Sequence, residues 1–251
     1  MSGCDSQNHS PDLRAQLLEL YTRLANEPAS DFGWRIGKEN AHTLGYADEW
    51  LNRLPKPVWE SAAAVGNPFS LGPIHTGETV VDIGCGSGAD ACIAALMVSE
   101  EGKVFGFDRT PAMIEKAARN AVISGLTQVV FQEAEMMELP LPDASADIVI
   151  SNGAINLAPD KGAVLREVFR ILRPGGRIQI ADMVRDPSNS DTACCGGKES
   201  WADCVSGTLH PEVFLAILAK EGFHDAELVG FTTYRTSPST IGALFRSVKP
   251  Y

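Results

Sequence analysis

The sequence contains no apolar run long enough for a membrane-spanning helix, and residues 1–11 are polar, without the apolar segment of a signal peptide. It also lacks any lysine- or arginine-rich run, because 32 acidic residues face 21 basic ones and the net charge is −11. Such a charge disfavours non-specific binding to nucleic acid or to anionic membranes. We therefore expect a cytoplasmic protein that acts on a small molecule and binds neither nucleic acid nor a membrane.

Internal repeats and low-complexity tracts are absent too, and 251 residues are ample for one sizeable core. From residue 78 onward, short apolar runs alternate with helical patterns, which indicates an α/β fold of three layers around a mostly parallel sheet. We expect strands at 79–83, 104–108, 129–132, 146–151, 177–183, 225–233 and 240–248. We expect helices at 11–26, from 90 onward, and at 111–123, 161–172 and 211–222.

Composition divides the chain into four predicted parts. Residues 1–73 form a polar tail and a helical cap, since the stretch up to 73 mixes aromatic residues with glycine and proline. Residues 74–183 form the cofactor-binding core, 184–210 an inserted cysteine-bearing lid, and 211–251 a final helix and the last strands. The aromatic residues of the cap either close over a ligand or pack the cap onto the sheet; they include Trp34, Tyr46, Trp50 and Trp59.

A glycine-rich turn follows the first predicted strand of the core, in the segment Thr79 to Ala89 (Thr-Val-Val-Asp-Ile-Gly-Cys-Gly-Ser-Gly-Ala). Glycine can take positive φ there and lets the backbone approach a ligand, and the turn ends at the start of a helix. The spacing satisfies the Gly-x-Gly-x-x-Ala fingerprint of dinucleotide-binding proteins. It lacks the lysine and serine or threonine of a triphosphate-binding loop, which excludes that class.

The same segment also resembles the Asp-x-Gly-x-Gly-x-Gly loop of class I S-adenosylmethionine-dependent methyltransferases. Asp108 ends the second strand, where a ribose diol needs an acceptor, and Glu133-Ala134-Glu135 follows the third strand, as in that superfamily. Leu172-Arg173-Pro174-Gly175-Gly176 resembles its Leu-x-Pro-Gly-Gly turn. No Tyr-x-x-x-Lys pair suited to hydride transfer is present. The resemblance implies a Rossmann-like methyltransferase fold and S-adenosylmethionine as the cofactor.

The resemblance also implies the residues that bind the cofactor. They are Asp82, Gly84, Cys85, Gly86, Gly88, Asp108, Arg109, Met113, Ala134, Glu135 and Asn152.

The acceptor side resembles one family in particular. Ser-Asn-Gly-Ala-Ile-Asn-Leu-Ala-Pro-Asp-Lys at 151–161 resembles the signature Ser-Asn-Cys-Val-Ile-Asn-Leu-x-Pro-Asp-Lys of the arsenite S-adenosylmethionine methyltransferases. The segment that begins at Cys204 and the turn Gly66-Asn67-Pro68 resemble two further segments of that family. The likeness implies Cys204, Asn152 and Asn156 as catalytic residues.

In that family three cysteine thiolates hold trivalent arsenic, a soft ion that prefers soft ligands. Here Cys204 matches one position, whereas Gly153 and Val65 occupy the other two. Cys194 and Cys195 are candidate replacements, so Cys194, Cys195 and Cys204 form the predicted arsenic(III) ligand set. Alternatively, Cys194 and Cys195 are surface thiols and Cys204 is a small buried apolar residue.

Methyl transfer to a soft nucleophile needs alignment and exclusion of water more than acid–base help. An acceptor that must lose a proton would need a base, for which His42, His75 and His210 are candidates. The expected function is methyl transfer from S-adenosylmethionine to a small acceptor, with an arsenical first. The alternatives are a small organic or thiol acceptor without arsenic activity, a non-catalytic thiol-based metal(loid) binder, and a nicotinamide oxidoreductase.

Overall fold

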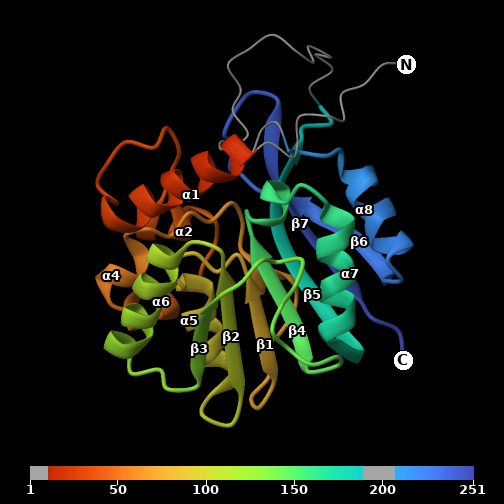
Figure 1. Cartoon of the computed structure of the whole chain (residues 1–251), viewed down its shortest axis with the longest axis horizontal. Helices are drawn as coiled ribbons and strands as arrows, with labels where there is room; N and C mark the ends of the chain where they lie inside the picture. The colour runs from red at the N-terminus through yellow and green to blue at the C-terminus, as the bar shows by residue number, and fades with distance from the viewer. Residues whose placement is uncertain (1–10, 189–206) are drawn as a thin grey trace.

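A computed structural model describes residues 11–188 and 207–251, which form a seven-stranded sheet with helices on both faces (Figure 1). The strand order is β3-β2-β1-β4-β5-β7-β6; the first five of these are parallel, and β7 runs antiparallel to both β5 and β6. The strands are β1 Thr79–Ile83, β2 Lys103–Asp108, β3 Val129–Glu133, β4 Ala146–Asn152, β5 Leu172–Arg185, β6 His224–Phe231 and β7 Thr240–Val248. This architecture confirms the predicted three-layer, Rossmann-like fold.

Neighbouring residues of β1 enter different halves of the core because side chains alternate along a strand. Val80 packs in a cluster with α5 (Ala89–Val98) and the N-terminal cap. Val81 packs in a second cluster with α7 (Lys161–Ile171) and α8 (Pro211–Lys220). Burial on both faces explains why the sequence of β1 is a near-continuous apolar run.

The N-terminal cap consists of short helices and α1, which crosses one end of the sheet beside α6 (Figure 1). These elements are α1 Pro11–Asn26, α2 Gly37–Thr43, α3 Asp48–Arg53, α4 Lys56–Trp59 and η1 Pro68–Leu71, while α6 spans Pro111–Ser124. The buried Lys116 Nζ of α6 donates to the Ala25 carbonyl at 3.0 Å, and Ser61 Oγ donates to the Leu24 carbonyl at 2.8 Å. These two bonds fix the C-terminal half of α1 to the body of the protein.

The aromatic residues of the cap pack against one another. Tyr46 makes edge contacts with Trp59 and Phe69, at centroid distances of 6.3 and 6.1 Å, and Trp50 lies 5.2 Å from Phe69. Edge-to-face pairs at this distance fix the relative orientation of the rings. Of the two predicted roles, the structure supports packing of the cap onto the sheet.

The start of β5 differs from the prediction. The Pro174-Gly175-Gly176 sequence does not precede the strand; it lies inside β5, which begins at Leu172. Leu172 pairs with Ala146, and regular pairing resumes between Arg177 and Ile148 after a register shift. Proline cannot donate a ladder hydrogen bond and glycine weakens a strand, so Pro174, Gly175 and Gly176 are accommodated in this irregular stretch of the strand.

At its other end β5 continues to Arg185, two residues beyond the predicted end of the strand at 183. The amide of Arg185 donates to the Leu209 carbonyl at 2.9 Å, so the two ends of the 184–210 segment lie side by side. The division at 73/74, 183/184 and 210/211 stays a prediction. In the described ranges, no helix has both the length and the apolar character that crossing a membrane requires.

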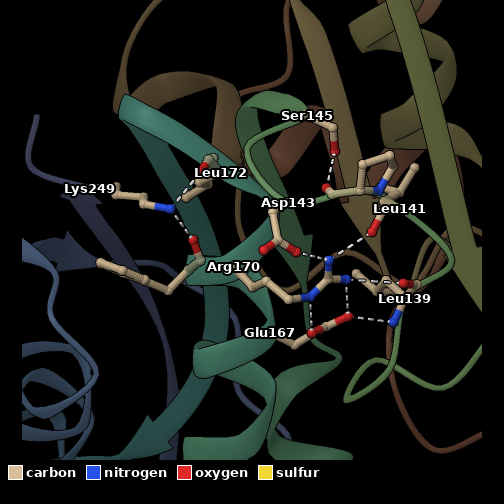
Figure 2. A network of polar contacts seen from close by, with 10 residues as sticks. Leu139, Leu141, Asp143, Ser145, Glu167, Arg170, Leu172 and Lys249 are labelled. Carbon is tan, nitrogen blue, oxygen red and sulfur yellow. Dashed lines mark hydrogen bonds and ion pairs between the residues drawn. The ribbon is translucent and has the colours of Figure 1, made fainter.

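The loop between β3 and β4, residues 134–145, is held in place by Arg170 of α7 (Figure 2). The Arg170 guanidinium donates to the carbonyls of Leu141 and Leu139, at 2.8 and 3.2 Å, and forms ion pairs with Glu167 and Asp143 at 2.7 Å. Glu167 in turn accepts the Leu139 amide at 2.6 Å. We name these contacts the Arg170 clamp; they fix the loop whose first residues reach the site described next.

Candidate cofactor and acceptor site

A cavity of about 130 Å³ opens at the carboxyl ends of β1, β2 and β4, and α1 lies over it. Ligands bind at this edge in open α/β sheets. Its wall combines the glycine loop, the residues after β2 and β3, the segment 152–159, residues 61–64 of the cap and three apolar residues of α1. The three from α1 are Leu17, Tyr21 and Leu24.

The glycine loop adopts the predicted positive-φ conformation. The amides of Gly84 and Cys85 both donate to the Phe107 carbonyl, at 2.8 and 2.9 Å, which fixes the loop against β2. A Cβ on Gly84 would stand 2.2 Å from the Ala154 Cβ, so this position admits no side chain. At Gly86, where φ is +51°, a Cβ would meet nothing within 4 Å, so a ligand can approach the backbone there.

Gly88 differs from the other predicted contact glycines because it is outside the cavity wall. A Cβ there would lie 2.7 Å from Phe131 and 2.9 Å from Ala117. Gly88 therefore lets α5 pack closely against β3 and α6. Close packing explains this glycine, and the prediction that Gly88 contacts the cofactor stays a prediction.

Asp108 is held in a fixed orientation at the end of β2. Its Oδ2 accepts the Gly86 amide at 3.0 Å and its Oδ1 accepts the Thr110 amide at 2.9 Å. Burial raises the pKa of this carboxyl, and the two N–H donors oppose the rise. Each oxygen keeps an acceptor site beyond these bonds, as two ribose hydroxyl donors require.

Asp82 contributes a buried carboxylate with an unsatisfied oxygen. The residue is 1% exposed, and its Oδ2 has no hydrogen-bond partner among the described residues. Burial, then the charges of Asp90 and Asp108, raise its pKa well above the ordinary value. An unpaired buried acceptor in a cavity wall is suited to an ammonium or other cationic ligand group.

The adenine side of the predicted site contains Ala134, Glu135, Arg109 and Met113, all of which line the cavity. The Ala134 amide donates to the Asp108 carbonyl at 3.1 Å, so the loop after β3 is tied to β2. Glu135 forms an ion pair with Arg14 of α1. Arg109 donates to the Arg14 carbonyl at 3.2 Å. This side of the cavity is thus joined to the helix that covers it.

Asn152 lines the cavity, but its amide is already engaged. Its Oδ1 accepts the Val65 amide at 2.9 Å, and its Nδ2 lies 2.9 Å from both the Gly66 carbonyl and Asp90 Oδ2. A third acceptor, the Tyr46 hydroxyl, lies 3.0 Å away. The side chain therefore orients its surroundings, and a direct catalytic role would require breaking these bonds.

Asn156 has a structural role in the fold, and its predicted catalytic role stays a prediction. This residue, in η2 (Ile155–Leu157), is buried outside the cavity wall. Its Nδ2 donates to Asp182 Oδ1 at 2.8 Å and to the Met183 carbonyl, and its amide donates to Asp182 Oδ2 at 3.1 Å. Asn156 thereby fixes η2, whose residue Leu157 does line the cavity.

Cys194, Cys195 and Cys204 lie outside the described residues, so the predicted arsenic(III) ligand set stays a prediction. Cys85 lines the cavity, whereas Cys92 is buried in the core. Burial raises the pKa of both thiols, that of Cys92 to about 12. None of the described histidines lines the cavity, and the described residues form no cluster with the composition of a metal site.

Sequence reasoning missed Asp90, Thr110 and the α1 residues of the wall. Asp90 carried a signal, since it is an acid in the first turn of the helix after the glycine loop. The contribution of α1 carried none, because an apolar stripe does not identify the surface that it covers.

Residues 74–227 match the family described as "Methyltransferase domain", which is more than half of the chain. The chain belongs to this family of S-adenosylmethionine-dependent methyltransferases. The match decides between the two interpretations of the glycine loop, and the carboxylates of Asp82 and Asp108 fit the ammonium and ribose groups of S-adenosylmethionine.

Two curated relatives are named arsenite methyltransferase. The protein from Halobacterium salinarum is 39% identical over 65% of this chain and 41% of its own length. The protein from Aquipseudomonas alcaligenes is 34% identical over 72% of this chain and 54% of its own length. The chain thus spans about half the length of these relatives.

Among solved structures, an arsenic(III) S-adenosylmethionine methyltransferase from Chlamydomonas reinhardtii superimposes with a TM-score of 0.62 at 28% identity. The superposition covers 86% of this chain and 74% of that one. A geranyl diphosphate methyltransferase gives the same TM-score at 18% identity, which supports the fold alone.

Proposed function

We propose that this protein transfers a methyl group from S-adenosylmethionine to a small acceptor, with trivalent arsenic as the first acceptor to test. The observation that carries the proposal is the pair of carboxylates, the buried Asp82 and the half-buried Asp108, on either side of a glycine loop in a cavity. The similarity to three proteins named as arsenite or arsenic(III) methyltransferases supports the choice of acceptor.

When bound, S-adenosylmethionine supplies a methyl group on a positively charged sulfur. Asp82 binds the ammonium of its methionine moiety, and Asp108 accepts hydrogen bonds from the ribose hydroxyls. Leu17, Tyr21 and Leu24 of α1 exclude water from the covered side of the cavity. The chain thus aligns two partners for an in-line displacement, in which alignment supplies much of the rate.

A second acceptor class is favoured by the wall at Gly153. This residue lines the cavity without a side chain, and the neighbouring Val65 is apolar. Neither residue supplies a thiolate. A small organic molecule or thiol with its own lone pair therefore fits this wall as well as an arsenical does.

The test is a methyl-transfer screen by mass spectrometry with arsenite, monomethylarsenite, small thiols and small organic acids. Methylated product from any of them, together with S-adenosylhomocysteine, supports the proposal. Arsenite binding without any methylated product would instead support a non-catalytic metal(loid) binder. Cys204→Ser should abolish turnover of arsenite if that thiolate is a ligand, and leave turnover of an organic acceptor unchanged.

We further propose a cytoplasmic location and a small-molecule substrate rather than nucleic acid. Fractionation of cells that express the protein tests the first point. A filter-binding assay with tRNA and duplex DNA tests the second, with no retention expected at physiological salt.

A further inference from the structure

Tyr46 joins the cap to the cavity through its hydroxyl group. The residue belongs to the loop that connects α2 and α3, and its side chain is buried outside the cavity wall. Its hydroxyl donates to Asp90 Oδ1 at 2.8 Å. Asp90 is in the first turn of α5 and lines the cavity. A cap residue therefore contacts a carboxylate that faces the predicted cofactor.

Two donors from distant parts of the chain fix the Asp90 carboxylate. Tyr46 bonds to one oxygen and Asn152 Nδ2, from the end of β4, to the other at 2.9 Å. Asn152 also ties down the cap backbone at Val65 and Gly66. The cap, α5 and β4 thus meet in one partly buried network. Removing a donor from such a network leaves a buried acceptor unpaired.

The position of the hydroxyl is set by the ring to which it is attached. Trp59 and Phe69 contact the Tyr46 ring edge-on, at 6.3 and 6.1 Å between centroids. Phenylalanine at this position keeps those contacts and loses only the hydroxyl. The variant Tyr46→Phe therefore separates the hydrogen bond from the packing of the cap.

We propose that Tyr46 is a positioning residue for the methyltransferase reaction, which acts on the cofactor site through Asp90 and Asn152. Its hydroxyl keeps the Asp90 carboxylate ionised and aimed into the cavity, where it assists Asp82 in binding the positively charged end of S-adenosylmethionine. The proposal rests on the proposed function for its biological meaning. Its test uses equilibrium binding, which needs no methyl acceptor.

The groups that face Asp90 determine how the network responds to pH. They are Tyr46 from the cap, Asp82 from β1, Asn152 from β4 and Cys92 from α5 itself. Burial raises the pKa of Asp90 to about 6, and the hydrogen bonds from Asn152 and Tyr46 oppose that rise. Loss of the Tyr46 hydroxyl should raise this pKa further, since the ionised form loses a donor.

The experiment measures the dissociation constant of S-adenosylmethionine by calorimetry between pH 5 and 8. Wild-type affinity should fall as the pH decreases through about 6, because protonated Asp90 no longer attracts the cation. Tyr46→Phe should weaken binding about tenfold at pH 7 and move this midpoint to higher pH. A merely structural loss would weaken binding without moving the midpoint.

Tyr234→Phe is the matched control. Tyr234 is also buried, and its hydroxyl donates to the Arg35 carbonyl at 3.1 Å, outside the cavity wall. This variant should bind S-adenosylmethionine like the wild type, with an unchanged midpoint. Thermal unfolding of both variants reports whether each is folded.

A double-mutant cycle with Asp90→Asn completes the test and remains informative if Tyr46→Phe is destabilised. Once the charge is removed, the Tyr46 hydroxyl should add little, so the double variant should bind about as weakly as Asp90→Asn. Additive effects of the two substitutions, or an unchanged midpoint in Tyr46→Phe, would overturn the proposal. Absence of binding to the wild type would instead contradict the proposed function.

Discussion

The side chain of Val65 packs against Gly153, because a Cβ built on the glycine would stand 3.2 Å from Val65 Cγ1. These two positions are far apart in the sequence, yet they are neighbours, and Gly153 lines the cavity. In the arsenite methyltransferases, which this sequence resembles, cysteine thiolates occupy both of these positions. Each substitution suits the other, since glycine leaves room for the branched valine and the pair forms an apolar contact.

The first prediction restores both thiols. The variant Val65→Cys/Gly153→Cys should bind arsenite at least about tenfold more tightly than the wild type, because adjacent thiolates are soft ligands for a soft ion. The φ of +69° at Gly153 makes a side chain there cost roughly 1 kcal/mol of stability. Equilibrium dialysis with elemental analysis of bound arsenic measures the gain.

Val65→Ser/Gly153→Ser is the control for that experiment, since it has nearly the same shape and backbone cost without sulfur. It should bind arsenite no better than the wild type. Equal binding by the serine and cysteine variants would show that arsenic is held elsewhere.

A second prediction concerns Asp108. Asp108→Ala should weaken S-adenosylmethionine binding by about 2–3 kcal/mol, since two hydrogen bonds to a charged acceptor are lost. Calorimetric titration at pH 7 measures this change. Asp186→Ala, which lies just after β5 outside the cavity wall and is paired with Arg235 at 2.7 Å, is the control and should retain affinity. Unchanged affinity in Asp108→Ala would refute its proposed role at the ribose.

The sequence predicted those features whose causes are local. The apolar run of β1, the glycines after it and the acid that ends β2 lie within 30 residues, and each has its own steric or polar reason. Five of the six predicted contact residues in this segment line the cavity: Asp82, Gly84, Cys85, Gly86 and Asp108. The exception, Gly88, has the same local signal, but its glycine serves close packing against Phe131.

The features that the sequence did not predict depend on partners far along the chain. Asn152 is occupied by cap atoms 86 and 87 residues away, and Asn156 by Asp182, 26 residues on. A side-chain amide in a loop has the same local signature whether it meets a ligand or a backbone carbonyl. Residues 174–176 were predicted to precede β5 for a related reason. Proline and glycine indicate a turn, but they do not reveal that the residues on either side will both pair with β4.

A third prediction tests the Arg170 clamp. Arg170→Gln should lower the free energy of unfolding by about 1–2 kcal/mol at pH 7, since two carbonyls and the Glu167 carboxylate lose a charged donor that is only partly exposed to solvent. Urea denaturation measures this. Arg119→Gln is the control because Arg119 and Glu115 are 64% and 71% exposed in their ion pair, so the loss of this pair should have little effect.

The same clamp should respond to acid. The hydrogen bonds that Arg170 donates to Glu167 lower the pKa of this carboxyl from its ordinary value of 4.5. A carboxyl whose pKa is depressed by folding stabilises the folded state above its unfolded pKa and loses that contribution as the pH falls through its folded pKa. The difference between wild type and Arg170→Gln should therefore shrink below about pH 4.5. A difference that stays constant to pH 3 would assign the effect to the carbonyl contacts instead.

The last prediction concerns the ion pair between Arg14 and Glu135, which joins the N-terminal part of α1 to the cofactor side of the cavity. The C-terminal half of α1 is fixed by buried contacts, whereas Arg14 and Glu135 are 65% and 39% exposed. Arg14→Gln should therefore increase the dissociation rate of S-adenosylmethionine by about threefold at low salt, with little loss of stability. The effect should vanish in about 1 M salt because exposed charges are then screened.

Arg119→Gln, which removes a comparably exposed pair with Glu115 on α6, is the control and should leave the rate unchanged in a stopped-flow chase. A rate increase that persists at high salt would mean that α1 is held over the cavity by its apolar side chains and the Arg109 contact, rather than by this pair.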